Sequence, residues 1–285
     1  MHETPRATSG TDKFFWHRYD EVYSGVFSKL SGPIRVLEFG TFKGDSVRYL
    51  LDRFPQARIV SADILETLEY WPSDPRVEYV QIDQGDRKQI STLLRNQSSD
   101  WDLVIEDGSH HPGHQRDCLL ETLSFLNKGS TYIVEDIHSS QEQLRNFGLI
   151  SPARGGFIDD QGLNNFRALV KHTLFVKVVS RLPNRRPQPK VNLLTLLLAL
   201  ERRQAMGERL SDQEVKQLSS DGFFTELEVK ALDEAIKSVQ LYRRAGLPMS
   251  CHKCLSQNFE LTLLRCECGT RLYKDDDSMA AILRF

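Results

Sequence analysis

The segment IRVLEFGTFKGDS, residues 34–46, contains an apolar run, a glycine and then the polar start of another element. Residues 34–40 are rich in side chains that favour strands, and the run ends in glycine. Residues 46–54 have helical spacing, and Pro55 follows them. A strand, a tight turn and a helix in this order are the first unit of an α/β sheet.

The same alternation continues along the first half of the chain. Four further short apolar runs are expected to be strands, at residues 57–64, 77–83, 102–107 and 130–136. Helices are expected between them at residues 87–96 and 112–126. Short apolar strands that alternate with helices predict a mostly parallel sheet with helices on both faces, in a Rossmann-like α/β fold.

The remaining segments are expected to be additions to this core. Residues 14–30 have the spacing of an amphipathic helix, residues 182–190 contain three prolines and resemble a linker, and residues 191–246 are mainly helical. Residues 271–285 are expected to form two strands with a turn at residues 275–277. The expected units are an N-terminal helical segment (1–30), the core (31–181), a helical insertion (182–248), a cysteine module (249–270) and C-terminal strands that complete the sheet (271–285).

Composition narrows the class of protein. The 285 residues are 40% hydrophobic and 27% charged, which is ordinary for a soluble globular protein, and the formal net charge is −2. Neither a nucleic-acid partner nor a membrane surface is expected from this charge. The N-terminus has no apolar signal region, and the apolar run at residues 191–200 is too short to cross a bilayer. A cytoplasmic location with reduced cysteines is therefore expected.

Acidic residues close to the ends of the first three strands predict a nucleoside pocket. The full G-x-G-x-x-G spacing of dinucleotide binders is missing, and Glu38 precedes the first glycine. A carboxylate there repels a pyrophosphate and attracts an ammonium group, which favours S-adenosylmethionine over NAD. Asp63 suits the ribose hydroxyls and Asp83 suits the adenine amino group. The candidate cofactor-binding residues are Glu38, Gly40, Thr41, Gly44, Ser46, Asp63, Asp83 and Gln84. The alternative is that these are loop glycines and solvated strand ends.

A second group of acids follows the fourth and fifth strands, in VIEDGSHH (residues 104–111) and YIVEDIH (residues 132–138). If these strands are neighbours, Asp107, Glu135 and Asp136 lie about 5 Å apart and repel one another unless a cation lies between them. Oxygen ligands suit Mg²⁺ or Mn²⁺, and such an ion lowers the pKa of a bound hydroxyl. Glu106 is left out because strand alternation points it away from Asp107.

His110 is the candidate general base. It lies in the loop that leaves the fourth strand, three residues after Asp107. An imidazole titrates near neutrality, so it can accept the proton of a hydroxyl. The alternative is an ordinary loop histidine.

Four of the five cysteines are clustered near the C-terminus. Cys251 and Cys254 form a C-x-x-C pair, and Cys266 and Cys268 form a C-x-C pair followed by glycine. Two short cysteine turns of this kind can hold a structural Zn²⁺ ion, with free thiols as the alternative. His252 is a substitute ligand for the same ion.

Several of these segments together resemble the metal-dependent sugar O-methyltransferases of macrolide biosynthesis, within the group often labelled cephalosporin hydroxylase-like. The matching segments are residues 10–19, 35–46, 82–86, 105–111, 129–140 and 273–282. The resemblance implies a class I S-adenosylmethionine-dependent methyltransferase fold. It implies Asp107, Glu135 and Asp136 as metal ligands, His110 as the base and Asp63 as the ribose ligand. Residues 181–270 match poorly, so the acceptor does not follow from the resemblance.

The sequence therefore predicts an O-methyltransferase that acts on a sugar or a glycosylated small molecule. A catechol-type O-methyltransferase and a non-catalytic scaffold that binds S-adenosylmethionine are the alternatives. An iron oxygenase is disfavoured because facial-triad sites use two histidines and one carboxylate. Formation of a homo-oligomer is left open.

Overall fold

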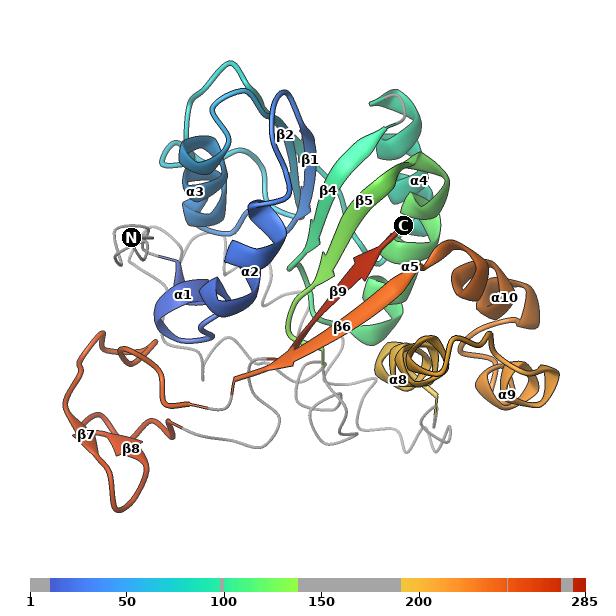
Figure 1. Cartoon of the computed structure of the whole chain (residues 1–285). Coiled ribbons are helices and arrows are strands. Elements are labelled where there is room, and N and C mark those ends of the chain that lie inside the picture. Colours follow the sequence, from blue (N-terminus) through green and yellow to red (C-terminus); the bar gives the residue numbers. More distant parts are fainter. Residues whose placement is uncertain (1–10, 98–99, 138–190, 245, 273–278) are drawn as a thin grey trace, which may run out of the picture.

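The structure is a computed structural model, and it describes residues 11–97, 100–137, 191–244, 246–272 and 279–285. Its centre is a seven-stranded sheet with strand order β3-β2-β1-β4-β5-β9-β6 (Figure 1). The strands are β1 (Arg35–Phe39), β2 (Arg58–Asp63), β3 (Val77–Gln81), β4 (Trp101–Glu106), β5 (Leu126–Val134), β6 (Ser238–Arg243) and β9 (Met279–Arg284). β1 to β5 pair in parallel, and β9 is antiparallel to both β5 and β6. The predicted mostly parallel sheet is confirmed.

Successive residues of the central strands face two different cores. On β4, Val104 packs into one hydrophobic cluster, while Leu103 and Ile105 pack into the other. Because both faces are covered, these strands are apolar over most of their length rather than alternating apolar and polar. This continuous apolar pattern is the reason that the sequence predicts them.

Helices cover both faces of the sheet, as predicted (Figure 1). On one face lie α1 (Asp12–Phe15), α2 (Asp20–Phe27) and α3 (Asp45–Arg53). On the other lie α4 (Arg87–Asn96), α5 (Pro112–Thr122) with the short 3₁₀ helix η1 (Leu123–Phe125), α8 (Leu193–Ala205), α9 (Asp212–Leu218) and α10 (Glu226–Ala235). A small hairpin of β7 (Phe259–Glu260) and β8 (Arg265–Cys266) lies apart from the sheet. In the part of the chain described, no helix is long and apolar enough to cross a membrane.

The structure corrects two predictions about the chain outside the core. The single helix expected at residues 14–30 is two helices, separated by a turn in which Arg18 has a φ of 57°. Residues 238–243, expected to be helical, form β6, an edge strand with Ser238 and Gln240 exposed. Of the two strands expected at the C-terminus, the second is present as β9, whose antiparallel partners are β5 and β6, and the first falls partly outside the described residues.

Some predictions lie outside the described residues. They concern the loop at 152–157, the helix at 163–181, the linker at 182–190 and the turn at 275–277.

Candidate functional site

One cavity of about 530 Å³ opens at the carboxyl ends of the parallel strands. Gly40 after β1, Asp63 at the end of β2 and Asp83 after β3 line one part of it. Asp107 and Asp136, which follow β4 and β5, line another part together with His110 and Glu135. Ligands of open parallel sheets bind at this edge. The two sites predicted from sequence therefore share one cavity.

Asp107, His110 and Asp136 form a cluster at the ends of β4 and β5. Each offers one ligand atom, and these atoms lie within 4.8 Å of one another. His110 Nδ1 lies 3.9 Å from Asp107 Oδ1, and His110 Nε2 lies 4.0 Å from Asp136 Oδ2. His110 (φ 55°) and Asp136 (φ 50°) both have left-handed backbone conformations, which are unfavourable for residues other than glycine. Strain of this kind is concentrated at functional sites.

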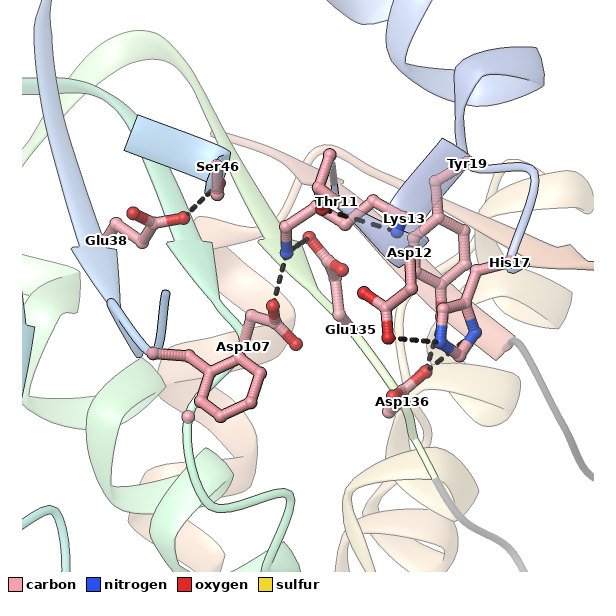
Figure 2. Close-up of polar contacts among 12 residues, drawn as sticks. Thr11, Asp12, Lys13, His17, Tyr19, Glu38, Ser46, Asp107, Glu135 and Asp136 are labelled. Atoms are coloured by element: carbon pink, nitrogen blue, oxygen red, sulfur yellow. Dashed lines mark hydrogen bonds and ion pairs between the residues drawn. The ribbon is translucent and has the colours of Figure 1, made fainter. Parts of the chain in front are cut away.

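Lys13 contacts two of the acids predicted to bind metal (Figure 2). Its ammonium group hydrogen bonds to Asp107 Oδ2 and lies 2.7 Å from Glu135 Oε1. Tyr23 also donates a hydrogen bond to Glu135 Oε1. Burial alone would lower the pKa of Lys13, but the charges of Asp107 and Glu135 outweigh it and raise the pKa. Lys13 is therefore a fixed positive charge beside the cavity.

The N-terminal segment also contacts Asp136. The Tyr19 hydroxyl donates a 2.6 Å hydrogen bond to Asp136 Oδ1, and His17 Nδ1 lies 3.6 Å from the same oxygen. Burial and the charge of Asp136 raise the pKa of Tyr19, so its hydroxyl remains a donor. The sequence predicted an amphipathic helix here and residues 10–19 matched the resembled family, but no site role was predicted for Lys13, His17 or Tyr19. The signal was a lysine and a histidine among the aromatic residues of KFFWHRY.

The residues at this end of the cavity fit a hard divalent cation. Asp107 and Asp136 present carboxylate oxygens, the donors that Mg²⁺ and Mn²⁺ prefer. Lys13 balances only one of the three carboxylate charges, so further positive charge is favoured there. Glu135 does not belong to the cluster of Asp107, His110 and Asp136, because its carboxylate contacts Lys13 and Tyr23. Its role as the third metal ligand stays a prediction.

At the other end of the cavity, Asp63 shapes the loop that follows β1. Its Oδ2 accepts hydrogen bonds from the backbone N–H groups of Thr41 (2.7 Å) and Phe42 (2.9 Å). Asp83 likewise accepts a 2.7 Å hydrogen bond from the N–H of Gly85. Both carboxylates line the cavity. Their contacts with the ribose and the adenine of the cofactor stay predictions.

Gly40 permits a close approach of two backbones. A Cβ at this position would lie 2.1 Å from the backbone oxygen of Asp107, and its φ is 100°. The loop after β1 therefore packs directly on the end of β4, which carries the predicted metal ligand. Gly44 has a φ of 73° and precedes α3, so its part is to turn the chain into the helix.

Other predicted cofactor residues lie behind the cavity wall. Glu38 is completely buried and accepts hydrogen bonds from the hydroxyl groups of Ser46 and Ser61. Burial raises the pKa of Glu38 to about 7, although Lys13 and Ser46 act in the opposite direction. Thr41 shares a 2.8 Å hydrogen bond with Ser61. The residues that do not line the cavity are Glu38, Thr41, Gly44 and Ser46, so their contact with a cofactor stays a prediction.

Gln84 lines the cavity and also holds the loop after β4. Its Nε2 donates a 3.0 Å hydrogen bond to Glu106 Oε1, and its Oε1 accepts a 2.9 Å hydrogen bond from Ser109 N–H. Burial raises the pKa of Glu106 to about 7, with His110 and Gln84 acting against it. Glu106 is not among the residues of the carboxylate–histidine cluster, and its carboxylate holds Gln84.

The four clustered cysteines come together around the β7–β8 hairpin. The ligand atoms of Cys251, Cys254, Cys266 and Cys268 lie within 4.8 Å of one another. None of the described cysteines forms a disulfide. Cys118 is buried in the core, as expected.

The fold is the Rossmann-like fold of class I methyltransferases, and the carboxylates lie at the edge where open parallel sheets bind ligands. A solved structure similar to this chain is the MycE methyltransferase from the mycinamycin biosynthetic pathway, in complex with Mg and SAH. It has a TM-score of 0.51 and 22% sequence identity, over 83% of this chain and 50% of that chain. This likeness shows the fold.

Curated relatives narrow the comparison. A Streptomyces olivaceus protein, 8-demethyl-8-(2-methoxy-alpha-L-rhamnosyl)-tetracenomycin-C 3′-O-methyltransferase, is 29% identical over 144 residues, which are 46% of this chain. Mycinamicin VI 2″-O-methyltransferase of Micromonospora griseorubida is 29% identical over 136 residues, which are 45% of this chain. The matches cover 35% and 33% of those relatives, so the chain spans about a third of their length. No family model matches the chain.

Proposed function

We propose that this protein is an O-methyltransferase that depends on S-adenosylmethionine and a divalent metal, and that it methylates a hydroxyl of a sugar or a glycosylated small molecule. The observation that carries the proposal is the shared cavity. A pocket with the acids of a nucleoside site is continuous with a cluster of carboxylates and a histidine. A methyl donor and an acceptor hydroxyl need such adjacency, because the two reacting atoms must meet in line.

The class of acceptor rests on the relatives. One is named as a 3′-O-methyltransferase of a rhamnosyl tetracenomycin, and another as mycinamicin VI 2″-O-methyltransferase. The matched solved structure is a methyltransferase crystallised with Mg and SAH. The matched 29% identity extends over nearly half of this chain. It supports a sugar hydroxyl as the acceptor rather than a catechol.

The chain's own residues have distinct parts in the proposed reaction. Asp107 and Asp136 hold the metal with Glu135 as the predicted third ligand, and Lys13 and Tyr19 hold these carboxylates in place. When bound, the divalent cation lowers the pKa of an acceptor hydroxyl. His110 takes the hydroxyl proton. The acceptor oxygen then bonds to the methyl carbon as the carbon–sulfur bond breaks, and S-adenosylhomocysteine leaves.

Calorimetric titration tests the cofactor and metal sites. S-adenosylhomocysteine is titrated into metal-free protein, and Mg²⁺ is titrated into the resulting complex. We expect binding in both steps, with Asp136→Asn losing the Mg²⁺ heat and keeping the cofactor heat. Asp52→Asn, at an exposed position of α3, is the matched control and should bind both ligands as the wild type does.

Transfer of a labelled methyl group then tests the acceptor. Rhamnosides and other glycosides are compared with catechols, with and without Mg²⁺. Metal-dependent methylation of a glycoside supports the proposal. Methylation of catechols alone would replace it with the catechol-type alternative, and cofactor binding without transfer to any acceptor would favour the scaffold. Absence of cofactor binding would overturn the methyltransferase assignment.

A further inference from the structure

We propose that Cys251, Cys254, Cys266 and Cys268 bind one structural zinc ion, and that the resulting zinc module (residues 246–272) fixes the N-terminal segment 11–19 against the carboxylates of the cavity. The first part concerns the module alone. The last step, the effect on metal binding in the cavity, rests on the proposed function.

The geometry of the thiols supports the ion. Cys251 Sγ lies 3.7 Å from Cys268 Sγ, and Cys254 Sγ lies 3.4 Å from Cys266 Sγ. The two cysteine pairs thus face each other, and four thiolates arranged in this way match tetrahedral zinc. Each thiol gives up its proton as it binds the metal. With four protein ligands no coordination position is left for a substrate, so the ion is structural.

The module is too small to be stable through its own hydrophobic core. Its regular structure is two strands of two residues each. Its leucines at 255, 261, 263 and 264 are 63%, 62%, 67% and 42% exposed, while Cys251, Cys266 and Leu272 are buried. Segments of this size need a metal or disulfides to fold, and the described cysteines form no disulfide. Zinc supplies the missing stability.

The buried side of the module packs on the N-terminal segment. Trp16 is 4% exposed and forms a cluster with Cys251, Cys266 and Leu272. The ring of His252 lies edge-on to Trp16, with centroids 4.1 Å apart. Trp16 therefore shares one buried cluster with two of the predicted zinc ligands.

Backbone hydrogen bonds strengthen this contact. The N–H of Met249 donates a 2.7 Å hydrogen bond to the carbonyl of Phe15. Arg244, which is 4% exposed, lies over the Trp16 ring and donates hydrogen bonds to the carbonyl oxygens of Trp16 and, at 2.8 Å, Leu272. Arg244 therefore joins the segment to the end of the module.

The same segment reaches the cavity on its other side. Trp16 N–H donates to the Asp12 carbonyl at 2.9 Å, and Tyr19 N–H donates to the Lys13 carbonyl at 2.8 Å. These bonds connect the anchored residue Trp16 to Lys13 and Tyr19, whose side chains contact the acids at the ends of β4 and β5 (Figure 2). In Figure 1, α1 lies between the β7–β8 hairpin and the sheet. A zinc ion at the hairpin thus stabilises the positions of Lys13 and Tyr19 beside the cavity, although the hairpin itself lies apart from the sheet.

Metal analysis and hydrogen exchange test the proposal on the full chain. We expect one zinc per chain in the wild type and in Lys253→Ala, an exposed change between the first two cysteines, and loss of zinc in Cys268→Ser. In Cys268→Ser, amide exchange in residues 11–23 should rise at least tenfold, while exchange in β4 stays as in the wild type. Absence of zinc from the wild type, or zinc loss with unchanged exchange in residues 11–23, would overturn the proposal.

Arg244→Leu distinguishes the contact between the module and residues 11–19 from the binding of zinc. This variant keeps all four cysteines, so it should retain zinc and still show faster exchange in residues 11–23 than the wild type. If Cys268→Ser unfolds as a whole, Arg244→Leu still tests whether the module anchors residues 11–19. Unchanged exchange in residues 11–23 of Arg244→Leu would contradict the anchoring role. None of these readouts needs methyl transfer, so a failure of the proposed function leaves them intact. Where that function holds, zinc loss should weaken Mg²⁺ binding at least tenfold.

Discussion

The ammonium nitrogen of Lys13 lies 2.7 Å from Oε1 of Glu135, a residue 122 positions later in the chain. The side chains are 4% and 2% exposed. The same ammonium group contacts Asp107 at the end of the neighbouring strand. A helix of four residues at the N-terminal end of the described chain therefore provides a buried countercharge for the carboxyl edge of the sheet.

Replacement of Lys13 by Met should lower the free energy of unfolding by roughly 3–5 kcal/mol in metal-free buffer, because it leaves the buried Glu135 carboxylate and the half-buried Asp107 carboxylate without this partner. Mg²⁺ should restore more stability to the variant than to the wild type, since it supplies the missing charge. Urea denaturation with and without Mg²⁺ measures both effects. Lys29→Met, at an exposed position, is the control and should change stability by about 0.5 kcal/mol or less. An unchanged midpoint in Lys13→Met would show that the ion pair contributes nothing.

Burial raises the pKa of Glu38 from 4.5 to about 7, which predicts a pH-dependent stability. An acid with a raised pKa holds its proton more tightly in the folded state, so its contribution is largest below pH 4.5 and is lost as the pH rises to about 7. Glu38→Gln cannot ionise, so its stability relative to the wild type should increase across this window by up to roughly 3 kcal/mol. Urea denaturation in the absence of cofactor at several pH values measures this difference.

Glu66→Gln is the control for this experiment, because Glu66 is exposed. Its stability should follow that of the wild type at every pH. Parallel curves for Glu38→Gln and the wild type would contradict a raised pKa for Glu38.

The core of the fold was predictable because its signals are local. Strands β1, β2 and β4 and the second half of β5 are buried on both faces, so each is a largely apolar run that ends close to a turn residue or an acid. β6 was missed because it is a half-exposed edge strand of six residues that directly follows three helices. Its strand conformation depends on pairing with β9, more than thirty residues later in the chain, and no local pattern carries that information.

The site was predictable in part for the same reason. Acids at the ends of neighbouring parallel strands must lie at one edge, and the structure places Asp107, His110 and Asp136 there. Glu135 lines the same cavity, but its carboxylate contacts Lys13 and Tyr23. Its N–H still bonds to the Glu106 carbonyl of the neighbouring strand, whereas Asp136 turns with a φ of 50°. The position of Lys13 follows from long-range packing of the N-terminal segment, which sequence spacing does not encode.

Alanine substitutions at two glycines should have opposite effects on stability. Gly40→Ala places a Cβ 2.1 Å from the backbone oxygen of Asp107 at a φ of 100°, so the loop or the end of β4 must shift. We expect a loss of at least about 2 kcal/mol, and weaker cofactor binding because Gly40 lines the cavity. Gly25→Ala lies within α2 with no atom within 4 Å, so it should stabilise the protein by about 0.5–1 kcal/mol. Thermal unfolding measures both, and equal effects would contradict the close approach at Gly40.

Replacement of His110 by Ala should lower the rate of methyl transfer without abolishing cofactor binding. His110 lies between Asp107 and Asp136, so its loss should lower the rate of methyl transfer to an aliphatic hydroxyl by roughly 10²–10⁴-fold while S-adenosylhomocysteine still binds. A phenolic acceptor ionises more easily and should be affected less. The matched control is His111→Asn, because His111 is exposed and caps α5 through its Nδ1, and asparagine is a favourable cap. Wild-type rates of glycoside methylation in His110→Ala would remove His110 from the mechanism and leave proton transfer to solvent or to another group of the cavity.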